Sequence, residues 1–207
     1  MKLKLPIFML ALFLCITESA GNSGDSYDYL RFTFGAEWSY SATLFYGHRL
    51  YYIAPETGRV DDRNDSFTYM TDGEAYLHAG YNINNLWNIS LYFGYIGIGE
   101  FHSGISGSLR ATRYFGNIPS ADRWFAYCDV GSGFSIKDIP EEIFTAKAGG
   151  GYRISLSRFT KLDFLVSLRC VYTHPDIYFY GEKIRNEDIG RNIGYLSSIS
   201  FGICITF

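Results

Sequence analysis

The 207-residue sequence predicts an all-β protein: an antiparallel transmembrane β-barrel of eight strands, or of ten if one ambiguous segment adds a hairpin. Three observations support this fold class. Stretches of about ten residues repeatedly carry an apolar side chain at every second position, which is the period of a strand with one apolar face. The connections between these stretches alternate between short and long. Aromatic residues gather at the ends of the stretches, as they do in the girdles of membrane barrels.

The N-terminal residues are typical of a signal peptide. Lys2 and Lys4 precede an apolar stretch of twelve residues, 5–16, which is too short to span a bilayer as a helix. Small residues at 19–21 would permit cleavage, although Glu18 is poorly placed for a cut after Ala20 and leaves the exact site open. We therefore expect a cleaved signal peptide over residues 1–21 and a barrel domain over residues 22–207.

Eight segments carry the alternation, and each is expected to form one strand. In chain order they are 30–37, 74–83, 87–95, 108–115, 124–131, 144–154, 162–173 and 192–207. The last is the clearest, because Ile203, Ile205 and Phe207 share a large apolar face and alternate with small residues. The glycines at 149–151 lie inside the sixth segment and no helix follows them. We interpret them as relief of crowding in a strand and not as a phosphate-binding loop.

The alternation by itself leaves open which face points outward, so a soluble sandwich or lipocalin-like barrel is the alternative. The connection lengths favour a membrane barrel, in which turns on the periplasmic side are short and outer loops are long. The short connections are 84–85, 117–122 and 157–161, and the long ones are 38–72, 97–104, 135–142 and 174–191. Two aromatic girdles are expected, one from Trp87, Phe115, Trp124, Tyr152 and Phe207 and the other from Tyr95, Tyr172 and Tyr195.

The C-terminal residues 198–207 carry a resemblance to a known family. They alternate strictly, end in Phe207, and resemble the terminal signal that the barrel-assembly machinery recognises in outer-membrane barrel proteins. The whole mature chain is similar to small eight-stranded barrels of the outer-membrane-protein-A superfamily, and segments 122–126 and 149–158 resemble uncharacterised Bacteroidota envelope proteins. The resemblance implies a Gram-negative outer-membrane location, contact with outer-membrane lipid, and the assembly machinery as a partner during biogenesis.

The segment 41–53 is too apolar for an ordinary surface loop. We expect it to extend the first hairpin above the membrane. It would otherwise fold back over the lumen, or add two strands and make the barrel ten-stranded.

The predicted lumen face collects nine charged residues: Arg31, Glu37, Glu74, Arg110, Asp129, Lys147, Arg153, Asp163 and Arg169. The interior of an eight-stranded barrel is about filled by side chains. Charges at that depth must be paired, because an unpaired buried charge is costly. The sequence therefore favours a salt-bridged plug over a narrow pore.

Composition and motifs exclude several other functions. The net charge is −3 and no run of Lys or Arg exists, so we expect no nucleic-acid partner. Cys128, Cys170 and Cys204 are an odd number without clustered spacing, and no His stands in a metal-binding pattern, so we expect neither a disulfide framework nor a metal or cofactor.

A catalytic interpretation rests on one short segment. His102 is a candidate base and Ser103 a candidate nucleophile, with Glu100 two residues before the His. However, the side chains of neighbouring residues usually point apart, and a catalytic triad is defined by its geometry. The sequence leaves enzymatic activity open and favours a role in envelope structure, or in binding an unidentified extracellular or periplasmic ligand through surface loops. The alternatives are a lipid-modifying enzyme acting on lipid A acyl chains, or a narrow pore.

Overall fold

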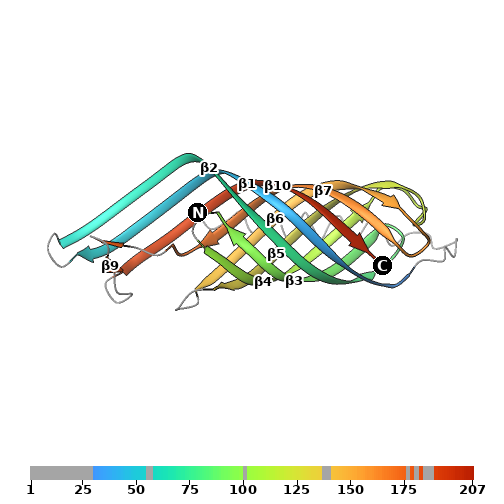
Figure 1. The fold of residues 1–207 in the computed structure, drawn as a ribbon, viewed down its shortest axis with the longest axis horizontal. Helices are drawn as coiled ribbons and strands as arrows, with labels where there is room; N and C mark the ends of the chain where they lie inside the picture. The colour runs from blue at the N-terminus through green and yellow to red at the C-terminus, as the bar shows by residue number, and fades with distance from the viewer. Residues whose placement is uncertain are drawn as a thin grey trace.

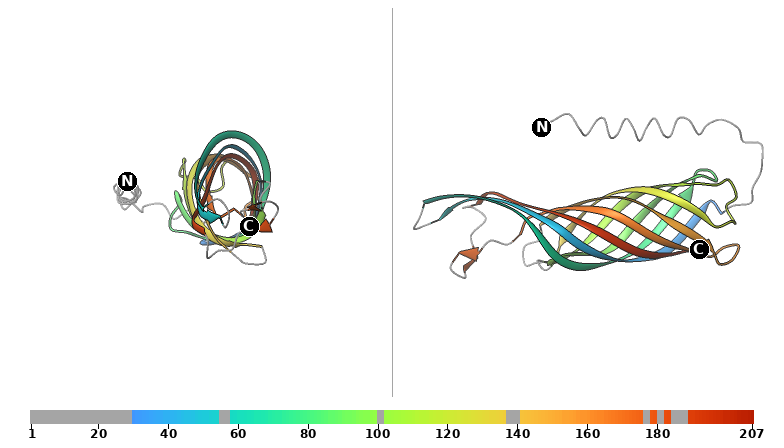
Figure 2. Two further views of the ribbon diagram at one scale, coloured as in Figure 1. Left: turned by 90° about the vertical axis from the view of Figure 1, so that its left-hand side faces the viewer. Right: turned by 90° about the horizontal axis from the view of Figure 1, so that it is seen from above.

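The computed structural model describes residues 30–54, 58–99, 102–136, 141–175, 178–179, 182–183 and 189–207. The expected signal peptide, 1–21, lies outside the described residues. Within the described ranges, no helix is long and apolar enough to cross a membrane. Eight antiparallel strands form a closed barrel (Figure 1), and the view along its long axis shows the ring (Figure 2, left).

The ring follows the chain order, and the first strand pairs with the last to close it. The ring strands are β1 (Phe32–Ala54), β2 (Gly58–Asn82), β3 (Trp87–Ile98), β4 (His102–Tyr114), β5 (Arg123–Ser135), β6 (Glu142–Ser155), β7 (Lys161–Thr173) and β10 (Ile189–Thr206). The two short strands β8 (Tyr178–Phe179) and β9 (Glu182–Lys183) pair only with each other. The predicted count of eight barrel strands is thus confirmed.

The two ends of the barrel differ. Three short connections, 83–86, 115–122 and 156–160, meet the start of β1 and the C-terminus at one end, which we call the turn end. There, Phe34 and Phe207 exchange two backbone hydrogen bonds of 3.0 and 2.7 Å, which join the first strand to the last. The opposite end, where the β1–β2 hairpin projects, is the hairpin end (Figure 1).

The polarity of the barrel is inverted relative to a soluble protein. Large apolar side chains such as Phe93, Trp124 and Leu168 are exposed on the outer surface, whereas charged side chains are buried inside. A continuous apolar exterior on this scale is unfavourable in water and suits lipid, and closure of the ring leaves no unpaired edge within it. The outer and lumen faces are the ones that the alternation predicted for a membrane barrel, and the soluble alternative does not fit.

Segment 41–53 forms part of β1 and lengthens the first hairpin, as expected. β1 and β2 contain 23 and 25 residues, and β10 pairs with β1 as far as the Tyr52–Ile189 pair. The β2–β3 pairing, in contrast, ends at Glu74–Ile96. Three strands therefore continue beyond the ring (Figure 1), and we call this part the hairpin extension: residues 44–54, 58–69 and 189–193.

The glycines of β6 allow close approach of neighbouring backbones. A Cβ atom added to Gly149 or Gly151 would collide with the carbonyl oxygen of Val166 or Phe164 on β7. Neither glycine has a positive φ. Their role in the barrel wall is therefore relief of crowding, in agreement with the sequence interpretation.

Candidate functional site

Among the described residues, ten charged side chains are buried in the lumen, five acidic and five basic. They are Glu37, Asp72, Glu74, Asp129 and Asp163, with Arg110, Arg123, Lys147, Arg153 and Arg169. Eight of the nine residues that the sequence placed in the lumen are among them. The exception is Arg31, which is exposed and lies in a bend before β1 begins at Phe32, at the rim where solvent reaches both faces.

Asp72 and Arg123 were not predicted to face the lumen. Asp72 lies in a predicted connection and Arg123 lies just before a predicted strand, whereas in the structure Asp72 is inside β2 and Arg123 begins β5. Each stands at an even spacing from a residue on the lumen face, Asp72 two before Glu74 and Arg123 two before Phe125. Continuing the alternation past the apparent strand ends would have found them.

The middle of the lumen is organised around Arg110 of β4. Its Nε donates to Asp129 Oδ2 at 3.0 Å, and its two terminal nitrogens donate to the Glu37 carboxylate at 2.5 and 3.0 Å. The rings of Tyr92 and Tyr127 lie over the guanidinium, with centroids 4.0 and 4.4 Å from its carbon. One arginine thus links three strands, and a bidentate pair of this kind fixes geometry as well as charge.

A second cluster lies nearer the hairpin end, on β2, β6 and β7. Arg169 contacts Asp72 at 2.6 Å and Glu74 at 2.9 Å, and Lys147 Nζ donates to the other oxygen of Glu74 at 2.5 Å. Asp72 also accepts a hydrogen bond from the Gly99 amide at 2.9 Å. Every charge in this cluster has an opposite partner.

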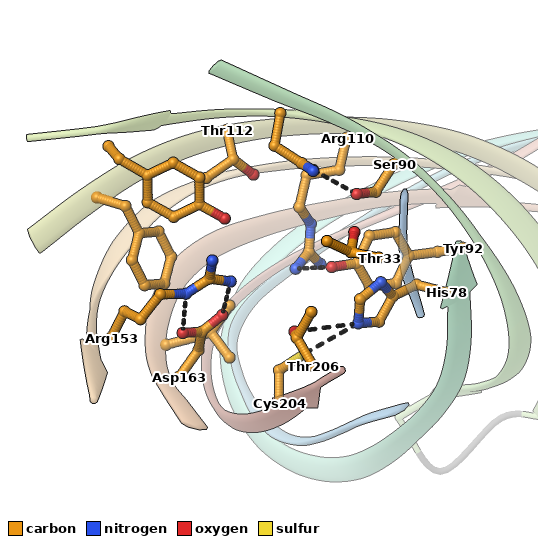
Figure 3. Close-up of a pocket in the computed structure, with 14 residues that line it drawn as sticks. Thr33, His78, Ser90, Tyr92, Arg110, Thr112, Arg153, Asp163, Cys204 and Thr206 are labelled. Carbon is orange, nitrogen blue, oxygen red and sulfur yellow. Dashed lines mark hydrogen bonds and ion pairs between the residues drawn. The ribbon is translucent and has the colours of Figure 1, made fainter. Parts of the chain in front are cut away.

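A third group lies nearer the turn end. Arg153 donates to both oxygens of Asp163, at 2.7 and 2.6 Å (Figure 3). Arg123 has no carboxylate within ion-pair distance among the described residues; it lies 3.9 Å from the Tyr114 ring centroid and donates to the Asn85 carbonyl at 2.7 Å. A cation–π contact and a backbone acceptor thus take the place of an ion pair.

Beyond the charges, the hairpin end of the lumen holds an apolar cluster. Met70, Ile96, Ile98, Ile143 and Leu196 are buried there and pack together, and Ile96, Ile98 and Ile143 are fully inaccessible to solvent. Leu196 lies in a predicted strand on the predicted lumen face, whereas Met70, Ile98 and Ile143 fall outside the segments predicted as strands, so the alternation showed only part of this cluster. It separates the ion pairs from the hairpin end.

A small cavity of about 20 Å³ lies among the lumen side chains and has room for about one water. Figure 3 shows the His78 imidazole directed at Cys204 and Thr206. Its Nε2 lies 3.3 Å from Cys204 Sγ and 3.5 Å from Thr206 Oγ1, and its ring stacks on Tyr92. In the described part of the chain, no group of three or more His, Cys, Asp or Glu residues is placed to hold a metal ion.

The structure does not assemble the candidate catalytic residues. Glu100 lies outside the described residues. His102 contacts Thr173 of the lumen wall, with Nε2 2.9 Å from Oγ1, and Ser103 follows it in β4, so their side chains lie on opposite faces of the strand. The lipid-modifying enzyme therefore stays an alternative hypothesis, and the described residues give it no catalytic geometry.

The comparisons with known proteins concern the fold. No family model matches the chain, and no curated protein matches it. Among solved structures, the outer membrane protein OprG from Pseudomonas aeruginosa aligns over 87% of this chain and 97% of its own, with 10% identity and a TM-score of 0.53. The chain folds as an eight-stranded outer-membrane β-barrel.

Two further solved barrels are similar to this outer-membrane barrel at lower scores. Neisserial surface protein A covers 85% of this chain and 97% of its own at 12% identity, with a TM-score of 0.41. The N-terminal β-barrel domain of Pseudomonas aeruginosa OprF covers 83% and 97% at 12% identity, with a TM-score of 0.40. The likeness to OprG shows the fold, and the apolar exterior of the barrel suits a lipid bilayer.

Proposed function

We propose that this outer-membrane barrel is a plugged scaffold that holds the hairpin extension above the membrane as its interaction surface. Because short turns of such barrels face the periplasm, the turn end is periplasmic and the hairpin end faces outward. The scaffold role places the activity of the protein in the extension and not in transport through the lumen.

The observation that carries this proposal is the pairing of the buried charges. Nine of the ten contact an opposite charge within 3.0 Å, and the tenth, Arg123, is held by Tyr114 and the Asn85 carbonyl. Charges that line a water-filled pore are solvated and gain little from fixed partners, whereas desolvated charges need them. The apolar cluster above the ion pairs would also oppose the passage of ions.

Planar-bilayer recording tests the plug. The full-length mature chain, folded and inserted into a lipid bilayer, is expected to give no steady single-channel conductance. A stable, reproducible conductance would contradict the plug and make the protein a narrow pore.

A stability measurement complements the recording. Arg169→Ala leaves Asp72 without its ion-pair partner, and Glu74 keeps only Lys147, so the free energy of unfolding should fall by ~3–5 kcal/mol. Arg31→Ala removes an exposed arginine and is the matched control, for which no such loss is expected. Equal stability of the two variants in urea titrations of lipid-embedded protein would mean that Arg169 is solvated, as a pore would require.

A further inference from the structure

We propose that the outer face of the hairpin extension binds the phosphate-bearing head group of a glycolipid in the outer leaflet, through Arg49 and Arg191. This inference rests on the outward orientation proposed above and is independent of the plug, because a conducting barrel would carry the same extension.

Strand register gathers four arginines on this face. Arg49 of β1 lies directly opposite Arg63 of β2, and the next outward-facing residue of β1, Tyr51, pairs with Arg191 of β10. Arg59 completes the group and lies over the Tyr51 ring at 4.8 Å. Like charges placed directly opposite each other destabilise a sheet, and on this face Asp65 compensates Arg63 at 2.9 Å.

Among the residues that the structure describes, two of the four arginines have no acidic partner. Arg59 contacts Asp61 at 3.7 Å and Arg63 contacts Asp65 at 2.9 Å, both on the exposed surface. Across the ranges that the structure describes, no carboxylate lies within ion-pair distance of Arg49 or Arg191. With respect to those ranges, the guanidinium donors of Arg49 and Arg191 are available for a ligand.

The arginines border a cavity large enough for a sugar phosphate. Its volume is about 450 Å³, and its lining includes all four arginines as well as Asp61 and Asp62. Arginine presents a planar set of donors that matches phosphate oxygens in a bidentate contact. The excess of arginine over aspartate makes the cavity suited to an anion.

The position of the four arginines, just above the barrel, indicates that the ligand is a lipid. At the hairpin end, Phe144, Tyr172 and Tyr195 form a chain of ring contacts, with centroids 6.2 and 5.6 Å apart, on the outer surface. Such an aromatic girdle marks the level of the lipid head groups. The Arg49 guanidinium lies 5.9 Å from the Tyr195 ring centroid. Arg49 pairs with Ile193, which lies two residues from Tyr195 on β10, about 7 Å along the strand toward the tip of the extension. A phosphate of the outer leaflet would lie at this height.

Binding of purified lipid A to the full-length chain in detergent micelles tests the proposal. We expect the wild type to bind lipid A that carries its phosphates, and the Arg49→Gln/Arg191→Gln double variant to bind it at least about tenfold more weakly, because charge-assisted hydrogen bonds are lost. The control double variant Arg113→Gln/Arg158→Gln removes the same charge at the turn end and should keep wild-type affinity. The gel mobility of unboiled and boiled samples shows that each variant is folded.

Three results of the lipid A measurements would overturn the proposal. They are equal affinity of the wild type and the Arg49/Arg191 variant for lipid A, an equal loss in both double variants, and binding of dephosphorylated lipid A as tight as that of the phosphorylated form. Inorganic phosphate is the remaining probe. If it bound as tightly as lipid A, the ligand would be a soluble anion and the lipid assignment would be wrong. Bilayer recording tests only the plug, and lipid A binding tests only the arginine site. The proposed function and this inference can therefore fail separately.

Discussion

Leu168 and Arg169 are adjacent in β7 and have opposite environments. The Leu168 side chain is 65% exposed on the outer surface, and that of Arg169 is 1% exposed in the lumen. The period of two fixes this difference for every residue inside a strand, which is why eight lumen charges could be predicted. It does not fix where a strand begins or ends. Arg31 was therefore placed inside wrongly, and Asp72 and Arg123 were missed.

Leu168→Arg tests the outer face at a single residue. The substitution places a charge in the lipid-facing band, so we expect the free energy of unfolding to fall by ~2–4 kcal/mol. Leu168→Phe keeps an apolar side chain there and is the control. The measurement is urea-induced unfolding of each variant in lipid vesicles. If Leu168→Arg were as stable as Leu168→Phe, the band would not face lipid.

At the scale of strands, the segment that was hardest to predict is 41–53 of β1, which contains a β-bulge. The pairing of β1 with both neighbours shifts between Thr43 and Phe45, so the extra residue reverses the faces of all that follow. Leu44, Phe45 and Tyr46 are consecutive apolar residues, and they interrupt the alternation at this point. The apolar character of 41–53 was sufficient to predict an extended hairpin but not the faces of its residues.

The extension should be separable from the barrel. Gly47 and Asp65 are cross-strand partners, so replacing residues 48–64 with an Asn-Gly turn closes the hairpin just above the ring. We expect the shortened protein to keep the gel mobility shift of a closed barrel, since all eight strands still pair around the ring, and to lose lipid A binding. A shortened chain that does not fold would show that the extension is part of the barrel's stability.

The C-terminal strand yields a prediction about assembly. Phe207 is half exposed at the turn end, and its backbone pairs with Phe34. If the side chain is a signal for the assembly machinery, deleting Phe207 should lower the yield of folded barrel in cells, with export unchanged. The deleted chain should still refold in detergent, where no machinery acts. An unchanged cellular yield would leave Phe207 as a girdle aromatic alone.

At the scale of the whole molecule, the partners of the buried charges come from distant parts of the chain. Glu37 and Arg110 are 73 residues apart, and Asp72 and Arg169 are 97 apart. The alternation predicts that these groups face the lumen, and the cost of buried charge predicts that they pair. Which carboxylate meets which arginine depends on strand tilt and register around the closed ring, and no local pattern contains that information.

The central claim is that the lumen is filled by paired charges, and a double-mutant cycle on Arg153 and Asp163 tests it most directly. The two side chains form a bidentate ion pair, and the Arg153 guanidinium also lies 4.5 Å from the Tyr114 ring centroid. The measurement is the free energy of unfolding of Arg153→Ala, Asp163→Ala and the double variant in lipid vesicles. Our account predicts that each single substitution costs ~3–5 kcal/mol and that the double variant loses clearly less than their sum, because neither Arg153 nor Asp163 is left behind without its partner. Single variants of wild-type stability with strictly additive effects would mean that the charges are solvated, and would contradict the account.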